Sequence, residues 1–568
     1  MCSSDLVRRL AANPLLLTII ALISYQNVRL PERRGELYRL AVEALAESWN
    51  RARSLGGQAI DLYLGDRRLD ARFVVNVLGR VASWVHATRP GGLVEQPVLE
   101  ARIAEAIREQ EGVSEARAQE LGHAFLDLVR RGSGLLQERG LGLYGFLHLT
   151  FEEYLAARAI ADLDADPAAG LLEHWSDAAW REVVLLAVGA SVPSQATRLL
   201  EALLSVRAEG DLSGKNVVLA GQALADVGRE GVVGGIWQKT AGALVALIEG
   251  SEARSVPART RADAGDVLGL FGDPRIGDDA WVEVPAGTFL MGTTPAEAAE
   301  IVKRYGKGWE RWVKDEMPRR RLHLGSFRIG KCPVTNREFK RFIDAGGYGA
   351  REHWSDAGWK WLHRPAEEQK DLEPWRQRGG RTEPKFWQYP ALGARRSNRP
   401  VVGVTWYEAQ AYCAWLTRHL SSSGKLGPGE VVTLPSEAEW EKAARGDDGR
   451  WWPWGNEWDP RRANTREGEV GATTAVGLYP DGKSPCHALD MAGNVWEWTR
   501  SVYKPYPYKP DDGQEDPKSE EPKGLRGGAW NLNADYARSA FRYDNTPDLA
   551  GNDVGFRCVV VPHAALPG

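Results

Sequence analysis

The first half of the chain repeats its hydrophobic residues at the spacing of an amphipathic helix. The segments LYRLAVEALAESW (residues 37–49) and ARIAEAIREQEG (residues 101–112) place apolar side chains three and four positions apart. Further apolar segments with polar or glycine breaks, among them WREVVLLAVGA and NVVLAGQALADV, follow up to about residue 267. The pattern predicts an all-α N-terminal half, ending in either a short helical-repeat array or an irregular helical bundle.

The pattern changes near the segment GLFGDPRIGDDAW, residues 269–281. Beyond it, short apolar runs alternate with Gly, Pro, Asn and Asp, which predicts short strands, many loops and a few helices. Tryptophan follows the same division, because five of the 23 Trp residues precede residue 281. We therefore expect three regions: a helical region at 1–165, a helical linker at 166–275 and a mixed α+β domain at 280–563.

Two helices of the second half can be placed from their capping residues. Thr405 followed by Glu408 forms a capping box before VTWYEAQAYCAWL, and Pro435 and Ser436 open a helix that Gly446 ends. Cys413 falls on the apolar face of the first helix, which predicts a small core residue rather than a nucleophile. The clustered tryptophans 451, 452, 454, 496 and 498 are expected in the core, with sugar stacking as the alternative.

Composition narrows the classes of partner and compartment. The formal net charge of -4 favours neither nucleic acid nor an anionic membrane as the main partner. The apolar run Leu15–Ile23 is shorter than the roughly 20 residues of a membrane span, and it lacks the basic region and small-residue cleavage site expected of a signal peptide. Five scattered cysteines form no metal or disulfide pattern, which predicts a reducing cytoplasm.

Two motifs of the N-terminal half resemble the module that follows the nucleotide core of NACHT-type STAND NTPases. They are LAANPLLLTIIALISYQNVRLPERRGELYRLAVEALAESW and the winged-helix motif YGFLHLTFEEYLAARAIA. The resemblance implies that His148 approaches a β-phosphate and that Pro14 lies near the base. We also read Phe146, Leu149, Phe151 and Tyr154 as an apolar face, with Glu152 and Glu153 facing solvent.

The N-terminal half contains no glycine-rich phosphate loop, so we expect the nucleotide core to precede residue 1 and ATP or ADP to bind only with that core. For this chain we therefore favour a core His148 bonded to backbone. The formal match GLYPDGKS, Gly477–Ser484, is discounted because Pro485 follows its serine. The opening residues MCSSDL suggest a chain that starts inside a longer protein.

The second half resembles the sulfatase-modifying-factor domain, the family of the formylglycine-generating enzyme. Eight ordered motifs support this, among them WVEVPAGTFLMGT, NRPVVGVTWYEAQAYCAWL, DMAGNVWEW, LRGGAWN and GFRCV. The resemblance implies a C-type-lectin-like, loop-rich fold. It also implies a structural calcium site at Asp490, Gly493, Val495 and Glu497, and a second site at Asn464 and Thr465 with Glu469 as a candidate ligand. The alternative is that Asp490 and Glu497 cap a tight turn.

The resemblance also argues against copper chemistry in this chain. The cysteines that bind Cu(I) in the family would fall at Leu532 and Ala537, and the active-site serine at Ala529. We expect no copper and no formylglycine-generating activity, because Cys558 is the only thiol near this segment in the sequence. Residual oxidoreductase chemistry with other residues and a purely structural scaffold remain the alternatives.

The segment Leu525–Val560 contains no Lys, Glu, Gln or Met. Its variable positions lie between fixed positions. The variable positions hold only residues that a randomised Asn codon can encode. This resembles the variable region of proteins diversified by retroelements. We expect a protein or other macromolecular ligand to contact the exposed side chains of Leu532, Asp535, Tyr536, Phe541, Tyr543, Asp544, Asn545, Thr546, Leu549, Asn552 and Asp553. Arg538 and Arg542 are expected to belong to the fixed frame and to pair with core carboxylates or carbonyls. Ligand binding by such a protein would then bias a STAND-type signalling switch.

Overall fold

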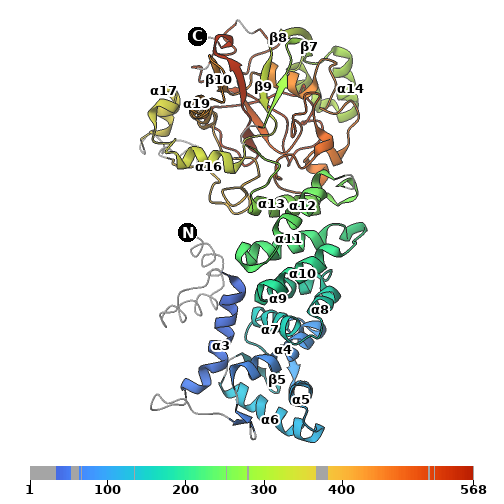
Figure 1. Cartoon of the computed structure of the whole chain (residues 1–568). Helices are drawn as coiled ribbons and strands as arrows, with labels where there is room; N and C mark the ends of the chain where they lie inside the picture. Colours follow the sequence, from blue (N-terminus) through green and yellow to red (C-terminus); the bar gives the residue numbers. More distant parts are fainter. Residues whose placement is uncertain are drawn as a thin grey trace. The chain divides into compact units, whose positions relative to one another are not determined.

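The computed structural model describes residues 33–52, 63–64, 67–68, 70–132, 135–250, 253–277, 280–365, 381–509, 512–516 and 518–566. Its contacts divide the chain into two compact units, residues 1–243 and 244–568 (Figure 1). Pro14 lies outside the described residues. None of the described helices is long and apolar enough to cross a membrane.

The described residues of the N-terminal unit form helices and two small sheets. Its helices are α3 (Arg34–Ala52), α4 (Ala71–Thr88), α5 (Gln96–Glu111), α6 (Glu115–Gly132), α7 (Leu149–Asp162), α8 (Pro167–His174), α9 (Arg181–Ala190), α10 (Pro193–Ser205) and α11 (Lys215–Val227). One sheet has the strand order β3 (Val94–Glu95), β5 (Leu143–Phe146) and β4 (Leu136–Gly140). A two-stranded pair joins β1 (Tyr63–Leu64) to β2 (Arg67–Arg68). Helix α12 (Ile236–Glu249) crosses the division between the units.

Helices α4 and α7 pack closely against each other in the N-terminal unit. A Cβ on Gly79 would lie 3.2 Å from the Leu155 carbonyl oxygen, so the helices approach closely at this glycine. Phe151 and Tyr154 are buried as expected, but Leu149 is 42% exposed and Glu152 is fully buried. Both expectations were wrong: Leu149, the first residue of α7, faces outward, and Glu152 is buried because it has a buried histidine partner, described below.

The C-terminal unit begins with α13 (Ala258–Phe271) and continues as a mixed domain. Its helices are α14 (Pro295–Tyr305), α15 (Glu310–Lys314), α16 (Asn336–Asp344), α17 (Asp356–Leu362), α19 (Trp406–Ser422) and α20 (Glu437–Arg445). Side chains of α13 contact the rest of this unit, because Asp266 pairs with Arg396 and Arg399, both at 2.7 Å.

Three small sheets form the strands of the C-terminal unit. One has the order β10 (Glu430–Thr433), β15 (Val559–Pro562), β9 (Phe327–Gly330) and β6 (Trp281–Val284). The second has the order β13 (Tyr543–Asn545), β12 (Lys523–Arg526), β11 (Trp496–Val502) and β14 (Val554–Phe556). The third pairs β7 (Gly287–Met291) with β8 (Arg320–Leu324). Short sheets joined by long loops match the expected loop-rich α+β domain.

Four helices of the C-terminal unit begin with the same local signal. Each has a capping box, in which a hydroxyl side chain and a glutamate three positions later satisfy each other's backbone N–H groups. The pairs are Thr294 and Glu297, Thr335 and Glu338, Thr405 and Glu408, and Ser436 and Glu439. The predicted starts of α19 and α20 are confirmed.

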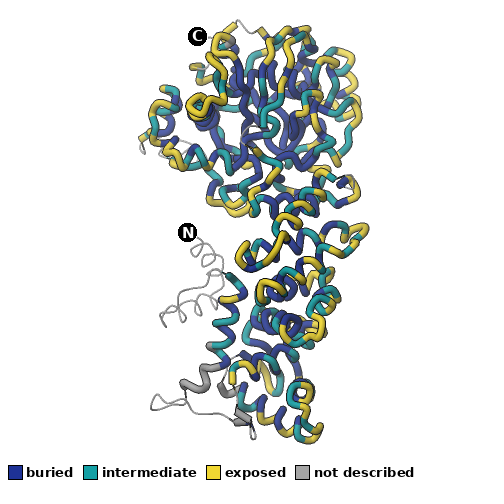
Figure 2. The backbone as a smooth tube through the Cα atoms, viewed as in Figure 1, coloured by how far each residue is buried: buried dark blue, intermediate teal, exposed yellow. Residues whose placement is uncertain are grey.

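Strand β11 is the centre of the domain, since all seven of its residues are buried. Trp498 and Trp452 have no exposed surface and Trp496 is 5% exposed, while Trp451 and Trp454 are only half-buried. Figure 2 shows the buried interior of this unit surrounded by exposed loops. The tryptophan core was therefore predicted correctly for three of the five residues.

Candidate recognition surface

Four arginines of the C-terminal segment are buried and ion-paired. Arg538 donates to both carboxylate oxygens of Glu316 at 2.8 and 2.6 Å, and Arg542 donates to both oxygens of Glu437 at 2.8 and 2.5 Å. Arg526 pairs with Glu441 and Arg557 with Glu497. The expectation that Arg538 and Arg542 pair with core carboxylates is confirmed, and we call these four arginines the arginine frame.

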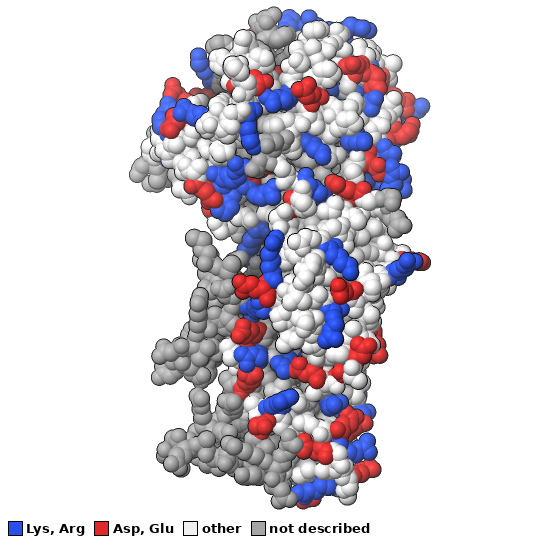
Figure 3. Space-filling view, in the orientation of Figure 1, with Lys and Arg blue, Asp and Glu red and all other residues white. Residues whose placement is uncertain are grey.

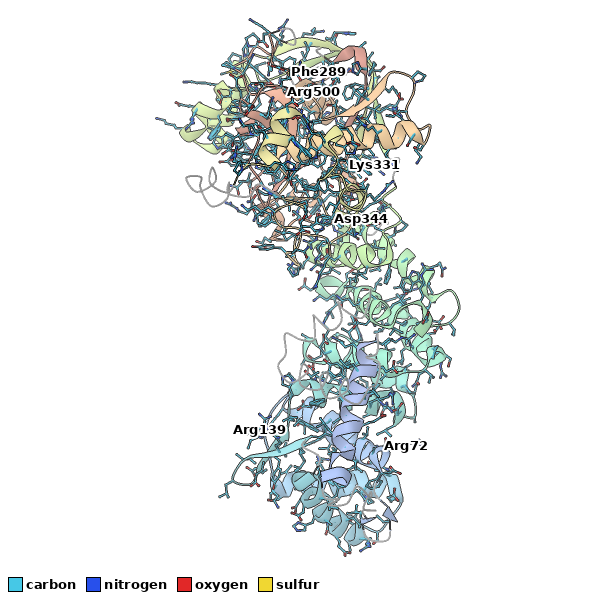
Figure 4. The ribbon with its side chains drawn as sticks, turned by 90° about the vertical axis from the view of Figure 1, so that its left-hand side faces the viewer. Arg72, Arg139, Phe289, Lys331, Asp344 and Arg500 are labelled. Atoms are coloured by element: carbon cyan, nitrogen blue, oxygen red, sulfur yellow. The ribbon has the colours of Figure 1, made fainter. Side chains whose placement is uncertain are left out.

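The surrounding domain compensates buried cations in the same way. Arg500, labelled in Figure 4, lies 2.6 Å from Glu439. Burial disfavours the charged form of Arg542, but the Glu437 carboxylate outweighs it and holds the pKa of Arg542 above its ordinary value. Bidentate pairs of this kind fix side-chain geometry, so the frame positions the backbone between its members.

A cluster of aromatic rings lies beneath the variable segment. Phe541 packs edge-on against Trp309 at 5.4 Å and against Tyr536 at 5.3 Å, while Tyr543 stacks on Trp496 at 5.6 Å. Trp312 contacts both Phe541 and Tyr543. The sequence interpretation missed Trp309 and Trp312, whose only signal was their spacing in KGWERW.

Most of the predicted ligand-binding residues reach the surface, but two do not. Asn552 is exposed; those that are half-buried are Leu532, Tyr536, Tyr543, Asp544, Asn545, Thr546, Leu549 and Asp553. Phe541 has no exposed surface and Asp535 is 6% exposed, so the expectation of exposure was wrong for both. Phe541 fills the aromatic core. Asp535 supplies its carbonyl oxygen to Arg538, and burial raises the pKa of its carboxyl above the ordinary value.

The positions that copper chemistry would need hold hydrocarbon side chains. Ala529 and Ala537 are buried, and Leu532 packs partly buried against the core. None of these side chains can ligate Cu(I). The sequence interpretation saw one thiol near this segment, whereas the structure places Cys413 Sγ 3.6 Å from Cys558 Sγ.

The two expected calcium sets differ in how well they fit a cation. Both oxygens of Glu497 already accept from Arg557, and one also accepts from Trp440 Nε1 at 2.7 Å. The Asp490 carboxylate accepts from the Gly477 N–H at 2.7 Å. The Asp490, Gly493, Val495 and Glu497 set therefore does not fit calcium without loss of the Arg557 pair.

The set around Asn464 fits a hard cation better. Asn464 Oδ1 and the hydroxyls of Thr465, Thr473 and Thr474 are buried without a hydrogen-bond partner. Gly493 is held against this loop, because a Cβ there would lie 2.3 Å from the Asn464 carbonyl oxygen. Glu469 is exposed. The described residues contain no group of three or more His, Cys, Asp or Glu side chains placed to hold a metal.

Two sequence expectations concerned nucleotide binding: the position of His148 and the formal phosphate-loop match at Gly477–Ser484. His148 is half-buried and caps α7, where its Nδ1 accepts from the Thr150 N–H at 3.2 Å. The segment Gly477–Ser484 contains a short 3₁₀ turn, η9 (Pro480–Gly482), and irregular structure follows Ser484. A phosphate loop needs a helix at that point, so this segment does not form one.

The fold and these sites define a chain with a formylglycine-generating-enzyme-like domain behind a NACHT-associated helical module. The sulfatase-modifying factor enzyme 1-like domain matches residues 270–561, and the chain belongs to this family. The winged helix-turn-helix domain C-terminal to NACHT matches residues 34–160.

The chain is similar to curated relatives of both active and inactive kinds. It is 35% identical over 249 residues to hercynine oxygenase of Mycolicibacterium thermoresistibile, covering 40% of this chain and 50% of that protein. It is 34% identical over 309 residues to the inactive C-alpha-formylglycine-generating enzyme 2 of Mus musculus, covering 50% of this chain and 85% of that protein. The chain thus spans half of the first relative's length.

Among solved structures, the chain is similar to Treponema denticola variable protein 1. The TM-score is 0.33 at 21% identity, covering 49% of this chain and 94% of that one.

Proposed function

We propose that the C-terminal domain is a catalytically inactive recognition module of a STAND-type signalling or conflict protein. Its ligand, a protein or other macromolecule, would contact the side chains that project between residues 529 and 553. The observation that carries the proposal is the arrangement of this segment. Buried, ion-paired arginines hold its backbone, while tyrosines, asparagines and aspartates between them stay partly exposed.

The chemistry of the surface supports binding. Tyr536 and Tyr543 offer large, rigid contact area over a packed aromatic base, and Asn545 and Asn552 offer adaptable hydrogen bonds. On the face drawn in Figure 3, acidic and basic side chains of the described residues occur on both units. We place the protein in the cytoplasm and expect the ligand signal to reach a nucleotide switch, by analogy with other NACHT-type proteins.

Sibling genes test the recognition proposal. Substitutions should concentrate at the partly exposed positions and spare the arginine frame, and a near-copy of the segment with Asn codons should lie nearby. Equal variation at frame and surface positions would contradict a diversified binding face and favour a structural scaffold.

The competing proposal is an oxidoreductase that retains activity with other residues, since the matched relatives include enzymes. Oxygen consumption measured with copper and cysteine-containing peptides decides between the two. Turnover above that of a boiled control would overturn the inactive assignment.

We also propose a structural calcium ion at Asn464. The buried oxygen atoms there, which lack hydrogen-bond partners, would coordinate it. Addition of CaCl₂ after chelation should raise the melting temperature of the wild-type chain. The Asn464→Ala variant should show no such rise. A rise that survives in this variant would place the ion elsewhere.

A further inference from the structure

A basic cavity lies inside the C-terminal unit, away from the residues assigned above to ligand recognition. Its volume is ≈ 420 Å³, within the range of roughly 300–1,000 Å³ typical of small-molecule sites. Residues 248–250, 253, 254 and 261 line one side, and the loops with η7 (Pro460–Arg462) and η9 line the other. Three carboxylates and five cations line it, the cations being Arg254, Arg261, Arg461, Arg462 and Lys483.

Arg261 is the unusual member of this lining. Its side chain is 5% exposed, its Nε has no hydrogen-bond partner, and its Nη1 makes one long contact of 3.4 Å to the Leu478 carbonyl oxygen. The guanidinium also lies 5.0 Å from the ring centroid of Tyr479. No carboxylate among the described residues forms a salt bridge with it. Burial lowers the pKa of Arg261 from its ordinary value.

The same domain compensates its other deeply buried arginines. Arg526, Arg538, Arg542 and Arg557 each face a glutamate at 2.8 Å or less. A buried guanidinium without a countercharge is costly, because it has lost its hydration without gaining an ion pair. Arg261 therefore has the charge and the free N–H group that a bound anion would satisfy.

Two of the three acidic residues of the cavity pair with cations of its own lining, and the third, Glu249, is exposed. Asp481 pairs with Arg254 at 2.6 Å, and Asp459 pairs with Arg461 at 3.0 Å and with Arg462 at 3.4 Å. The Lys483 side chain is exposed and forms no hydrogen bond or ion pair within the described residues. With five cations against three carboxylates, the lining keeps a net positive charge, and Arg261 receives only a through-space attraction from Asp481.

We propose that this cavity binds a small phosphoryl-bearing anion, held by Arg261 and by Lys483 and Arg461 at the rim. A guanidinium offers paired N–H donors that match phosphate oxygens, and an ammonium adds a mobile point charge. Lys483 belongs to the segment Gly477–Ser484, but it would act here as a rim cation and not within a phosphate loop.

Titration calorimetry of the whole chain with pyrophosphate, at about 50 mM ionic strength, tests the proposal. Pyrophosphate should bind at one site per chain, and the affinity should fall as salt is added, because exposed charges are screened. Inorganic phosphate should bind more weakly, since it presents fewer oxygens. Absence of pyrophosphate binding would overturn the proposal.

Variants locate the site. Arg261→Leu should lower the affinity for pyrophosphate about tenfold or more, as expected for loss of a charge-assisted contact. Arg321→Ala removes an exposed cation on β8 outside the cavity and should leave the affinity unchanged. Circular dichroism of each variant reports whether its fold is kept.

A second variant covers the case in which Arg261→Leu fails to fold. Lys483 and Arg461 are both exposed, so the double variant Lys483→Ala, Arg461→Ala should keep the fold and weaken pyrophosphate binding about fivefold or more. Unchanged affinity in this double variant, or an equal loss in Arg321→Ala, would show that the anion binds elsewhere and would overturn the proposal.

Discussion

The imidazole of His86 and the carboxylate of Glu152 form a buried pair, with Nδ1 2.9 Å from Oε1 and both side chains 1% exposed. The other ring nitrogen, Nε2, lies 3.0 Å from the carbonyl oxygen of Ala179. Both ring nitrogens face acceptors, so only the doubly protonated ring can donate to both at once. Glu152 also accepts the N–H of Gly91 at 3.0 Å, so one ion pair joins α4, α7 and the loop between α4 and β3.

This pair predicts that the N-terminal unit loses stability as the pH rises. Burial works against the charged ring, but Glu152 and the Ala179 carbonyl hold the pKa of His86 above its ordinary value. A histidine with a raised folded pKa contributes its full stability below its ordinary pKa of 6.5 and loses it as the pH passes the raised value.

The nearby Glu153 adds a second pH effect. Burial raises the pKa of its carboxyl to about 7, so the folded unit also loses stability as the pH rises from the ordinary pKa of this carboxyl to pH 7.

Hydrogen exchange of α4 and α7 peptides, corrected for intrinsic rates, measures this effect. Protection in the wild type should fall as the pH rises, first over the Glu153 range up to about pH 7 and further above the ordinary histidine pKa of 6.5. In His86→Gln, protection should be lower by roughly 3 kcal/mol at pH 6, because Glu152 is left buried without its cation. His123→Gln is the control, since His123 pairs with Glu100 while 71% exposed. Identical pH profiles for the wild type and His86→Gln would contradict the assignment.

The arginine frame predicts an asymmetry between buried and exposed ion pairs. Arg542→Leu leaves Glu437 in the core without its bidentate partner and should lower the free energy of unfolding by roughly 3–5 kcal/mol. Lys340→Ala breaks the exposed pair with Asp344 and should cost less than about 1 kcal/mol. Urea denaturation followed by tryptophan fluorescence measures both. Similar losses in the two variants would show that the Arg542 pair contributes no more than a surface contact.

Local signals in the sequence predicted the helices, whereas long-range pairs had to come from the structure. Thr405 and Glu408 are three residues apart, so the start of α19 is encoded locally. Glu152 was expected to face solvent because its partner, His86, lies 66 residues upstream and leaves no local pattern. The recognition segment contains one feature that the sequence predicted and one that it did not. Arginines in an apolar segment require carboxylates and were predicted to pair, but nothing local revealed that Phe541 packs against Trp309.

The surface and core positions of the recognition segment should respond differently to truncation. Phe541→Ala removes a ring with no exposed surface and should cost roughly 3–5 kcal/mol of unfolding free energy. Asn552→Ala, at an exposed position, should change it by about 0.5 kcal/mol or less. Thermal denaturation of both variants measures the difference. A large loss in Asn552→Ala would argue that the segment cannot tolerate diversification.

Cys413 and Cys558 should form a disulfide when the protein is oxidised. Their sulfur atoms lie 3.6 Å apart in the core, on α19 and on the segment just before β15, and a disulfide requires them to approach to about 2.05 Å. Diamide would take two electrons and two protons from the thiol pair, and cross-linking so long a loop should raise the unfolding free energy by up to roughly 5 kcal/mol.

Thiol counting after denaturation and peptide mass spectrometry measure this reaction. Cys558 and Cys332 both line a cavity of ≈ 70 Å³, so Cys332→Ser is the matched control and should leave the Cys413–Cys558 link intact. Burial raises the pKa of Cys558 well above its ordinary value, so the reaction should be slow near neutral pH and accelerate as the pH rises. A link between Cys332 and Cys558, or retention of both thiols after prolonged treatment at pH 9, would contradict the pairing.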